Sequence, residues 1–364
     1  MREINVSTNE AGQRLDKLLR KYLKNANTSF IYKMLRKKNI VLNDKKAEGK
    51  EILNLGDSVK MYFSEETFAT MTGRTGQNSG SAETNRAAAA SASAQTASAG
   101  KNSAQMHRAS SGNSSERREK HAFDAAGFRK HIVYEDENLL VLNKPSGWLS
   151  QSDGSGLPSV NELCLQYLMA TGALMEAQLQ TFKPGIANRL DRNTSGLILF
   201  GKTLPALQAL AGLLRDRTME KYYLAIVCGD IDHAQRIDGY LAKDEGTNRV
   251  EIRPQPFPDA VEIHTGYEPL KRSASYTVLK VHLITGKTHQ IRAHLRAIGH
   301  PIIGDPKYGR KDANAYYRTH GGVKSQLLHA WELHFPETLD GPLRNLAGQT
   351  LTAEPPKEFR QFFQ

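Results

Sequence analysis

A long stretch without large aliphatic residues constrains this fold more than any other feature of the sequence. Between Ser64 and Lys130 there is no Leu, Ile, Val, Trp or Tyr, and Ser, Ala, Thr, Gly and Asn dominate. Such a segment cannot bury enough apolar surface to offset the entropy that is lost on ordering. We therefore expect a disordered linker at 64–130, which separates a first domain at 1–63 from a second domain at 131–364.

The net charge of the chain is +11, and most of it lies ahead of this segment. Residues 1–63 contain fourteen Lys or Arg and seven Asp or Glu, which gives +7. An excess of this size favours a polyanionic partner such as a nucleic acid, although many basic proteins owe their charge only to a well-solvated surface. Charge alone leaves both interpretations open.

The cysteine usage and the N-terminus both indicate a cytoplasmic protein. Cys164 and Cys228 lie far apart in the sequence and form neither a Cys-x-x-Cys motif nor a disulfide framework, which fits a reducing compartment. No apolar run approaches the roughly 20 residues of a membrane helix. The polar N-terminus lacks the apolar segment of a secretory signal. We expect no membrane partner.

Two short helices and two strands are predicted in the first domain. Apolar residues recur at helical spacing over 12–23 and over 28–38, and apolar runs at 40–43 and 58–63 are typical of strands. This order resembles the alpha-L RNA-binding fold of a ribosomal small-subunit protein. The resemblance implies RNA contact through cations of the two helices, which are Arg14, Lys17, Lys33, Arg36, Lys37 and Lys38.

The consecutive cations Arg36, Lys37 and Lys38 also have a simpler explanation. Cations at the end of a helix compensate its negative dipole end. Three in a row exceed what that compensation needs, so we favour contact with phosphates. Such contacts supply affinity and position rather than a choice of sequence.

The second domain alternates apolar strand patterns with amphipathic helix patterns. The segments 132–135 and 139–143 flank a turn and predict a hairpin. Further strands are expected at 197–200, 222–227, 275–284 and 328–335. Helices are expected at 159–174, 204–217 and 288–298. The pattern predicts an α+β domain with a mixed, largely antiparallel sheet flanked by helices.

The usual motifs of several enzyme classes are absent from the sequence. There is no Gly-x-x-x-x-Gly-Lys-Ser/Thr and no Gly-x-Gly-x-x-Gly that opens a helix, so phosphoryl and hydride transfer lack their apparatus. His289 and His294 lack the spacing of metal ligands and no His-Glu-x-x-His occurs, so no metal site is expected. Ser195 lacks the preceding Gly of a hydrolase elbow.

A carboxylate between two cations remains, in Arg189-Leu190-Asp191-Arg192 ahead of an apolar strand. Loops that a rigid sheet positions often carry site residues. However, an Asp between two arginines is more often part of a surface ion pair. The same Arg-Leu-Asp occurs at 14–16, where we expect it on a helix surface. The tripeptide alone therefore decides nothing.

The longer string Arg-Leu-Asp-x-x-Thr-Ser-Gly-Leu at 189–197 resembles the signature of the RluA-type pseudouridine synthases. Three further stretches resemble motifs of that family in the same order, namely 142–147, 221–229, and 285–294 together with 299–309. An alpha-L domain ahead of the catalytic domain also matches the ribosomal members of the family. Two letters depart from the pattern, because Asn188 replaces the usual His and Lys287 replaces the usual Arg.

The resemblance implies that uridine is isomerised to pseudouridine, with Asp191 acting at the sugar. The carboxylate would either form a covalent intermediate at the anomeric carbon or stabilise positive charge there while removing a sugar proton. Arg292 would keep Asp191 ionised; without the resemblance, Arg292 would be taken for a surface cation. The reaction changes no redox state and adds no external group, so no cofactor is expected.

The resemblance also implies which residues contact the uridine. Tyr223 would stack on uracil and assist proton removal, and strand alternation would place it on the face opposite Tyr222. A uridine in helical RNA must first be flipped out, and Arg189 is the candidate to fill the vacated space. Candidates for further substrate contact are Lys144, Lys287 and Tyr308.

Three functions remain open at this point. The first is a pseudouridine synthase that acts on large-subunit ribosomal RNA, and the second is the same enzyme acting on transfer RNA. The third is a non-catalytic RNA-binding or ribosome-assembly protein on the same fold. The alpha-L domain favours the ribosome, and the joint presence of Asp191, Tyr223 and Arg292 favours catalysis. The basic, linker-tethered design suits a monomer.

Overall fold

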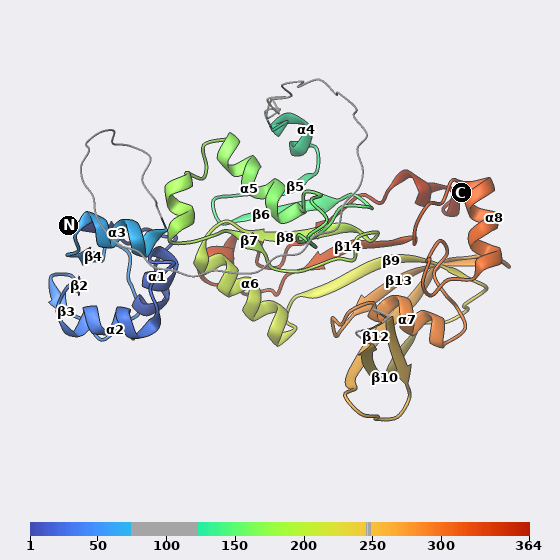
Figure 1. The fold of residues 1–364 in the computed structure, drawn as a ribbon. Coiled ribbons are helices and arrows are strands. Elements are labelled where there is room, and N and C mark those ends of the chain that lie inside the picture. Colours follow the sequence, from blue (N-terminus) through green and yellow to red (C-terminus); the bar gives the residue numbers. More distant parts are fainter. Residues whose placement is uncertain (74–122, 245, 247–248) are drawn as a thin grey trace, which may run out of the picture.

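The computed structural model describes residues 1–73, 123–244, 246 and 249–364. Figure 1 shows a small N-terminal unit at one end of the molecule, a larger body built around a long sheet, and helix α8 (Lys311–Gly321) at the opposite end. Most of the predicted linker, 74–122, lies outside the described residues. Its disorder therefore stays a prediction.

The N-terminal unit is a small sheet packed against helices. Its strands have the order β1-β4-β2-β3. Helices α1 (Leu15–Tyr22) and α2 (Thr28–Arg36) bury their apolar faces in a common core. The two predicted helices and two predicted strands are confirmed, and β1 and β3 are additional. The strands are β1 (Arg2–Asn5), β2 (Ile40–Leu42), β3 (Lys45–Lys46) and β4 (Ser58–Met61).

Both ends of the expected linker are helical, which corrects its boundaries. Helix α3 (Glu65–Thr72) buries Phe68 completely in the N-terminal core. Helix α4 (Ala125–Arg129) buries Phe128 against Trp148 and Tyr167 of the body. A single large aromatic side chain anchors each short helix. The absence of aliphatic residues was therefore an incomplete criterion for disorder at these ends.

The N-terminal unit also touches the body directly. The carboxylate of Glu10, which is buried, accepts a hydrogen bond from the Thr181 hydroxyl. The Gln208 side chain of α6 (Leu204–Asp216) donates to the carbonyl of Gly12 at 3.4 Å. The described contacts thus place the unit beside α6, as Figure 1 shows.

The body is built on one long sheet of order β11-β10-β12-β13-β9-β14-β8-β6-β5, with β15 on β14 and β7 on β8. Among the described strands only β14 and β8 pair in parallel, which confirms the predicted mixed, largely antiparallel sheet. The strands are β5 (Ile132–Glu135), β6 (Leu139–Lys144), β7 (Gly185–Ile186), β8 (Ser195–Gly201), β9 (Glu220–Cys228), β10 (Gln235–Asp244), β11 (Arg249–Arg253), β12 (Val261–Arg272), β13 (Tyr276–Leu283), β14 (Leu328–His334) and β15 (Thr350–Thr352).

Helices cover both faces of this sheet. On one face, α5 (Val160–Ala170) and α7 (Gln290–Ala297) pack on Phe200, Ala225 and Val281 in the largest core cluster. On the other face, α6 and η2 (Gly341–Leu346) pack on β6 and β8, and η3 (Lys357–Phe362) packs on β9. Alternation along β9 places Tyr223 on the α7 side. Tyr222 stacks with His282 and contacts His334 instead.

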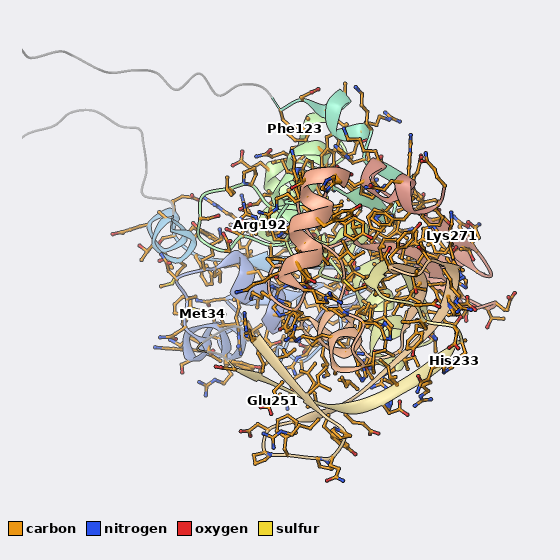
Figure 2. All side chains as sticks on the ribbon, turned by 90° about the vertical axis from the view of Figure 1, so that its right-hand side faces the viewer. Met34, Phe123, Arg192, His233, Glu251 and Lys271 are labelled. Carbon is orange, nitrogen blue, oxygen red and sulfur yellow. The ribbon has the colours of Figure 1, made fainter. Side chains whose placement is uncertain are left out.

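Strands β10, β11 and β12 and helix α8 were not predicted. Strand β10 buries only alternate residues, Ile237, Gly239 and Leu241, with charged or polar residues between them. Helix α8 buries none of its residues. Figures 1 and 2 both show the β10–β11–β12 end of the sheet, marked by Glu251 in Figure 2, projecting from the body. A projecting element has little core to bury, so its sequence carries a weak apolar signal.

Candidate active site

Asp191 lies on the loop between β7 and β8, and glycine is required where that loop enters the sheet. Gly196 has φ +110, and a Cβ there would lie 2.1 Å from the carbonyl oxygen of Ala330. Strands β8 and β14 could not approach this closely with any side chain at that position. The Gly of the predicted signature therefore seats the loop against β14, while Thr194 closes a turn by donating its N–H to the Asp191 carbonyl at 3.0 Å.

Side chains from the 144–150 loop hold this turn in place. Ser150 donates its hydroxyl to the Leu190 carbonyl at 2.7 Å and accepts from the Leu190 N–H at 3.0 Å. The Lys144 ammonium donates to the carbonyls of Pro145, Trp148 and Arg192, each at 3.0 Å. The backbone on both sides of Asp191 is thereby fixed.

This position of Lys144 corrects its expected role in substrate contact. Its side chain is completely buried, and the three donors of its ammonium are all used on the carbonyls. Burial lowers the pKa of Lys144 to about 7, and Asp191 opposes that shift. Lys144 thus holds the loop from the protein interior and does not reach a substrate.

A chain of charges connects Asp191 to the interior. Arg292 of α7 donates Nη1 to Asp191 Oδ2 at 2.6 Å, and its Nε and Nη2 bind the two oxygens of Asp305 at 2.7 and 2.9 Å. Burial alone would lower the pKa of Arg292, but the two carboxylates outweigh it and raise the pKa. The guanidinium is therefore a permanent cation in direct contact with the Asp191 carboxyl group.

Tyr308 lies beneath this arginine rather than in the cleft, which corrects its expected role in substrate contact. Its ring centre is 5.2 Å from Cζ of Arg292, and its side chain is buried. Its hydroxyl accepts from the Val250 N–H at 3.0 Å and lies 3.0 Å from His289 Nδ1. Tyr308 thus supports Arg292 and His289.

Tyr223 lies on β9 and lines the same cleft as Asp191. Its side chain is 7% exposed, and within the described part of the chain its hydroxyl has no hydrogen-bond partner. Burial first, and then the charge of Asp191, raise its pKa, so the hydroxyl stays protonated at neutral pH. A ring that is buried on one side and open to a cleft suits stacking on a planar base.

The cleft has a volume of about 860 Å³ and is rimmed by cations. Asp191, Tyr223 and Arg292 all line it, so the structure brings the three expected catalytic residues together. Arg189 and Lys287 are exposed at its wall, as expected for candidates that meet a substrate. Lys221 and Lys307 add two cations that were not predicted. No group of side chains that could hold a metal ion occurs among the described residues.

Comparison with known proteins identifies the family. The model of the RNA pseudouridylate synthase family matches residues 138–297. The ribosomal large subunit pseudouridine synthase C of Salmonella typhimurium is 30% identical over 339 residues, which cover 91% of this chain and 87% of the relative. This chain belongs to the RNA pseudouridine synthase family.

Other pseudouridine synthases agree with this assignment. The ribosomal large subunit pseudouridine synthase C of Vibrio cholerae serotype O1 is 29% identical over 333 residues, which cover 91% of this chain and 88% of the relative. The solved structure of human RNA Pseudouridylate Synthase Domain Containing 4 shares the fold, with a TM-score of 0.52 at 22% identity, and covers 66% of this chain and 95% of that one. The predicted family is confirmed, and the protein is an isomerase that acts on RNA.

Two residues of this synthase site were missed in the sequence. Asp305 is the buried anchor of Arg292, and His289 has its Nε2 3.8 Å from Asp191 Oδ2. Both lie inside stretches that resemble the family, 299–309 and 285–294. A buried arginine needs a carboxylate partner, so the one Asp in 299–309 was the signal that could have found Asp305. No pattern in the sequence pointed to His289.

Asn188, the letter that departs from the family signature, has a structural position in this synthase. Its side chain accepts from the Leu199 N–H at 2.8 Å and donates to the Leu197 carbonyl at 3.2 Å. It therefore fastens the chain before Asp191 to β8, and it also lines the cleft.

The cations expected to bind RNA lie on the surface of the N-terminal unit. Lys17, Lys33, Arg36, Lys37 and Lys38 are exposed. Arg14 is partly exposed and pairs with Asp16, with Nε to Oδ1 and Nη2 to Oδ2 both at 3.1 Å. No helix among the described residues is long and apolar enough to cross a membrane.

Proposed function

We propose that this protein converts specific uridines of large-subunit ribosomal RNA to pseudouridine, with Asp191 as the catalytic carboxylate. The observation that carries the proposal is the convergence of Asp191, Tyr223 and Arg292 in one cleft from a loop, a strand and a helix. The ribosomal substrate is supported by the names of the relatives from Salmonella typhimurium and Vibrio cholerae. Transfer RNA is the second candidate substrate.

Asp191 acts at the sugar of the target uridine. Arg292 occupies Oδ2, so Oδ1 is the oxygen that is freer to act. An ionised carboxylate either attacks the anomeric carbon or stabilises positive charge there while it removes a sugar proton. The glycosidic bond to N1 breaks, the base turns, and it is rejoined to the sugar through carbon-5; carbon-5 then loses a proton and N1 gains one. These steps balance without an external group, so the proposal includes no cofactor.

Tyr223 serves the base. Its ring stacks on uracil. Its hydroxyl stays protonated and has no other partner among the described residues, so it assists removal of the carbon-5 proton as a relay, which passes its own proton on as it takes up the new one. Arg189 fills the space of the flipped uridine. The exposed cation Lys287 binds phosphate at the cleft wall, and Lys221 and Lys307 add positive field there.

The N-terminal unit anchors the RNA. Its exposed cations suit phosphate contact, which gives affinity without sequence choice. The proposed division assigns RNA docking to residues up to about Gly73 and chemistry to the body from Phe123 onward. We include in the proposal that the protein works as a cytoplasmic monomer.

Tritium release from RNA labelled at uracil carbon-5 tests the function. Wild-type protein should release tritium from large-subunit ribosomal RNA and not from transfer RNA, and Asp191→Ala should release none. Release from transfer RNA alone would move the substrate to the second candidate. No release from either RNA would overturn the enzymatic proposal, and release by Asp191→Ala would remove Asp191 from its role. Asp16→Ala is the matched control and should retain activity.

A further inference from the structure

His289 stands between Asp191 and Tyr308 and has no part in the chemistry described above. It directly precedes α7, lines the cleft, and has only 8% of its side chain exposed. Its Nε2 lies 3.8 Å from Asp191 Oδ2, and its Nδ1 lies 3.0 Å from the Tyr308 hydroxyl. Its φ of +54 is in the left-handed region, which non-glycine residues rarely adopt. Such a conformation persists where surrounding contacts enforce it.

The hydrogen bonds of Tyr308 determine which nitrogen of His289 carries the proton. The Val250 N–H already donates to the Tyr308 oxygen at 3.0 Å. The hydroxyl proton of this buried tyrosine therefore needs an acceptor, and His289 Nδ1 is the one within reach among the described residues. Burial raises the pKa of Tyr308, so the proton stays on its oxygen. Nδ1 is then the acceptor, and the ring proton is on Nε2.

The charges around His289 keep it neutral near pH 7. Burial lowers its pKa, Asp191 and Asp305 raise it, and Arg292 and Lys307 lower it, with a net lowering from the usual value. A neutral ring with its proton on Nε2 presents an N–H to Asp191 Oδ2. The distance of 3.8 Å is longer than a hydrogen bond, as catalytic contacts often are before a substrate is bound.

We infer that His289 is a positioning residue of the reaction, which as the neutral Nε2–H ring closes on Oδ2 of Asp191 and leaves Oδ1 to face the sugar. Arg292 already donates to Oδ2 at 2.6 Å, so the two donors together fix the rotation of the carboxylate. The role in turnover rests on the proposed function. The proton position on the ring does not, because it follows from the burial of His289 and from its contacts in the absence of RNA.

The proton position is tested by ¹⁵N NMR of the imidazole nitrogens without RNA. Between about pH 6 and pH 8, the His289 Nδ1 should have the shift of an unprotonated nitrogen and Nε2 that of an N–H. His329 is the internal reference, because its contacts also place the ring proton on Nε2. Its Nε2 lies 3.0 Å from the Ala353 carbonyl, which can only accept, and its Nδ1 lies 2.8 Å from the Ser195 hydroxyl; the ring is fully buried. A protonated Nδ1 in His289 would overturn the inference whether or not the protein modifies RNA.

Two variants test the effect on turnover. His289→Asn retains a residue type that tolerates positive φ but is too short for either contact; kcat should fall about 10–100-fold with KM little changed. Tyr308→Phe keeps the ring under Arg292 and removes the hydroxyl proton that makes Nδ1 the acceptor, so the His289 proton can move to Nδ1, and kcat should fall with KM little changed. An unchanged kcat in His289→Asn or in Tyr308→Phe would overturn the positioning role.

Discussion

The tripeptide Arg-Leu-Asp occurs twice in this chain, and its aspartate has local partners in one copy and a distant partner in the other. At 14–16 the arginine and the aspartate pair with each other through two contacts of 3.1 Å at the start of α1. The side chain of Asp16 is 6% exposed and also accepts from the Tyr32 hydroxyl at 3.1 Å. At 189–191 the arginine is exposed, and Asp191 binds an arginine 101 residues away.

The difference shows that the partner, not the local sequence, decides what a carboxylate does. Among the described residues the side-chain partners of Asp16 all belong to the N-terminal unit: they are Arg14, Tyr32 and Arg20, the last at 3.7 Å on the same helix. Asp191 has a rigid partner on one oxygen and 27% of its side chain open to the cleft. A site carboxylate needs that combination of a fixed charge behind it and space in front of it.

The largest expected effect comes from exchanging each aspartate for asparagine. Asp191→Asn keeps the shape but loses the charge, and turnover should fall at least about a thousandfold, as it does when a group that acts on the reacting atoms is removed. Asp16→Asn should leave turnover on saturating RNA within about twofold. It should cost about 1–3 kcal/mol of unfolding free energy, because partners of a buried carboxylate lose their acceptor. Single-turnover kinetics and urea denaturation measure the two effects, and equal loss of turnover in both variants would break the comparison.

The next effect tests the fixed charge behind Asp191. Arg292→Met leaves the Asp305 carboxylate buried, with none of its side chain exposed, and should cost about 3–5 kcal/mol of unfolding free energy. Asp305→Leu in the same chain should restore much of that stability but none of the turnover. Full turnover in the double variant would show that Asp191 needs no cation.

The stability of the Arg292–Asp305 pair should also depend on pH. Burial alone would raise the pKa of Asp305, but Arg292 and the amides of Tyr308 and Lys307 lower it below the value of the unfolded chain. The pair therefore stabilises the fold above the unfolded pKa, and this contribution is lost as pH falls through the lower folded pKa. Urea denaturation from about pH 7 down to about pH 3 should show this loss in the wild type and not in the double variant.

The sequence predicted those parts of the fold that bury a regular apolar stripe. The strands at 197–200 and 222–227 and the helix at 204–217 correspond to β8, β9 and α6, because each packs against the core along its length. The projecting strands β10 and β11 and the exposed helix α8 bury few side chains, and so they leave little pattern to detect.

The site residues were predictable only where the sequence resembles the family motifs. Asp191, Tyr223 and Arg292 each lie within a stretch that resembles a family motif, and all three line the same cleft. Lys144 was assigned to substrate because it is a cation in a motif, whereas it is buried beneath three carbonyls. Motifs preserve supporting residues as well as contacting ones. Which kind a residue is depends on the direction of its side chain, which spacing along the chain does not encode.

A smaller effect, on RNA binding, is expected from the cations in α2 and just after it, because each contacts phosphate separately. Replacing Lys33, Arg36, Lys37 and Lys38 by Gln should weaken RNA binding and reduce the slope of log affinity against log salt by about 0.7–0.9 for each phosphate that the variant no longer neutralises. Turnover at saturating RNA should not change. Lys50→Gln, an exposed cation of the same unit outside both helices, is the matched control. An unchanged slope in the fourfold variant would remove this surface from RNA binding.

The smallest effects separate the two arginines of the repeated tripeptide. Arg14→Gln breaks a partly exposed pair, so it should cost under about 1 kcal/mol of unfolding free energy, and it should lower the salt slope of RNA binding only slightly. Arg189→Gln should leave stability within about 0.5 kcal/mol, because the side chain is exposed and makes no hydrogen bond within the described residues. It should slow turnover a few-fold on helical RNA and not on an unstructured oligonucleotide, because only the helical substrate requires the uridine to be flipped out. Equal slowing on both RNAs would mean that Arg189 binds the substrate directly and does not replace the flipped base.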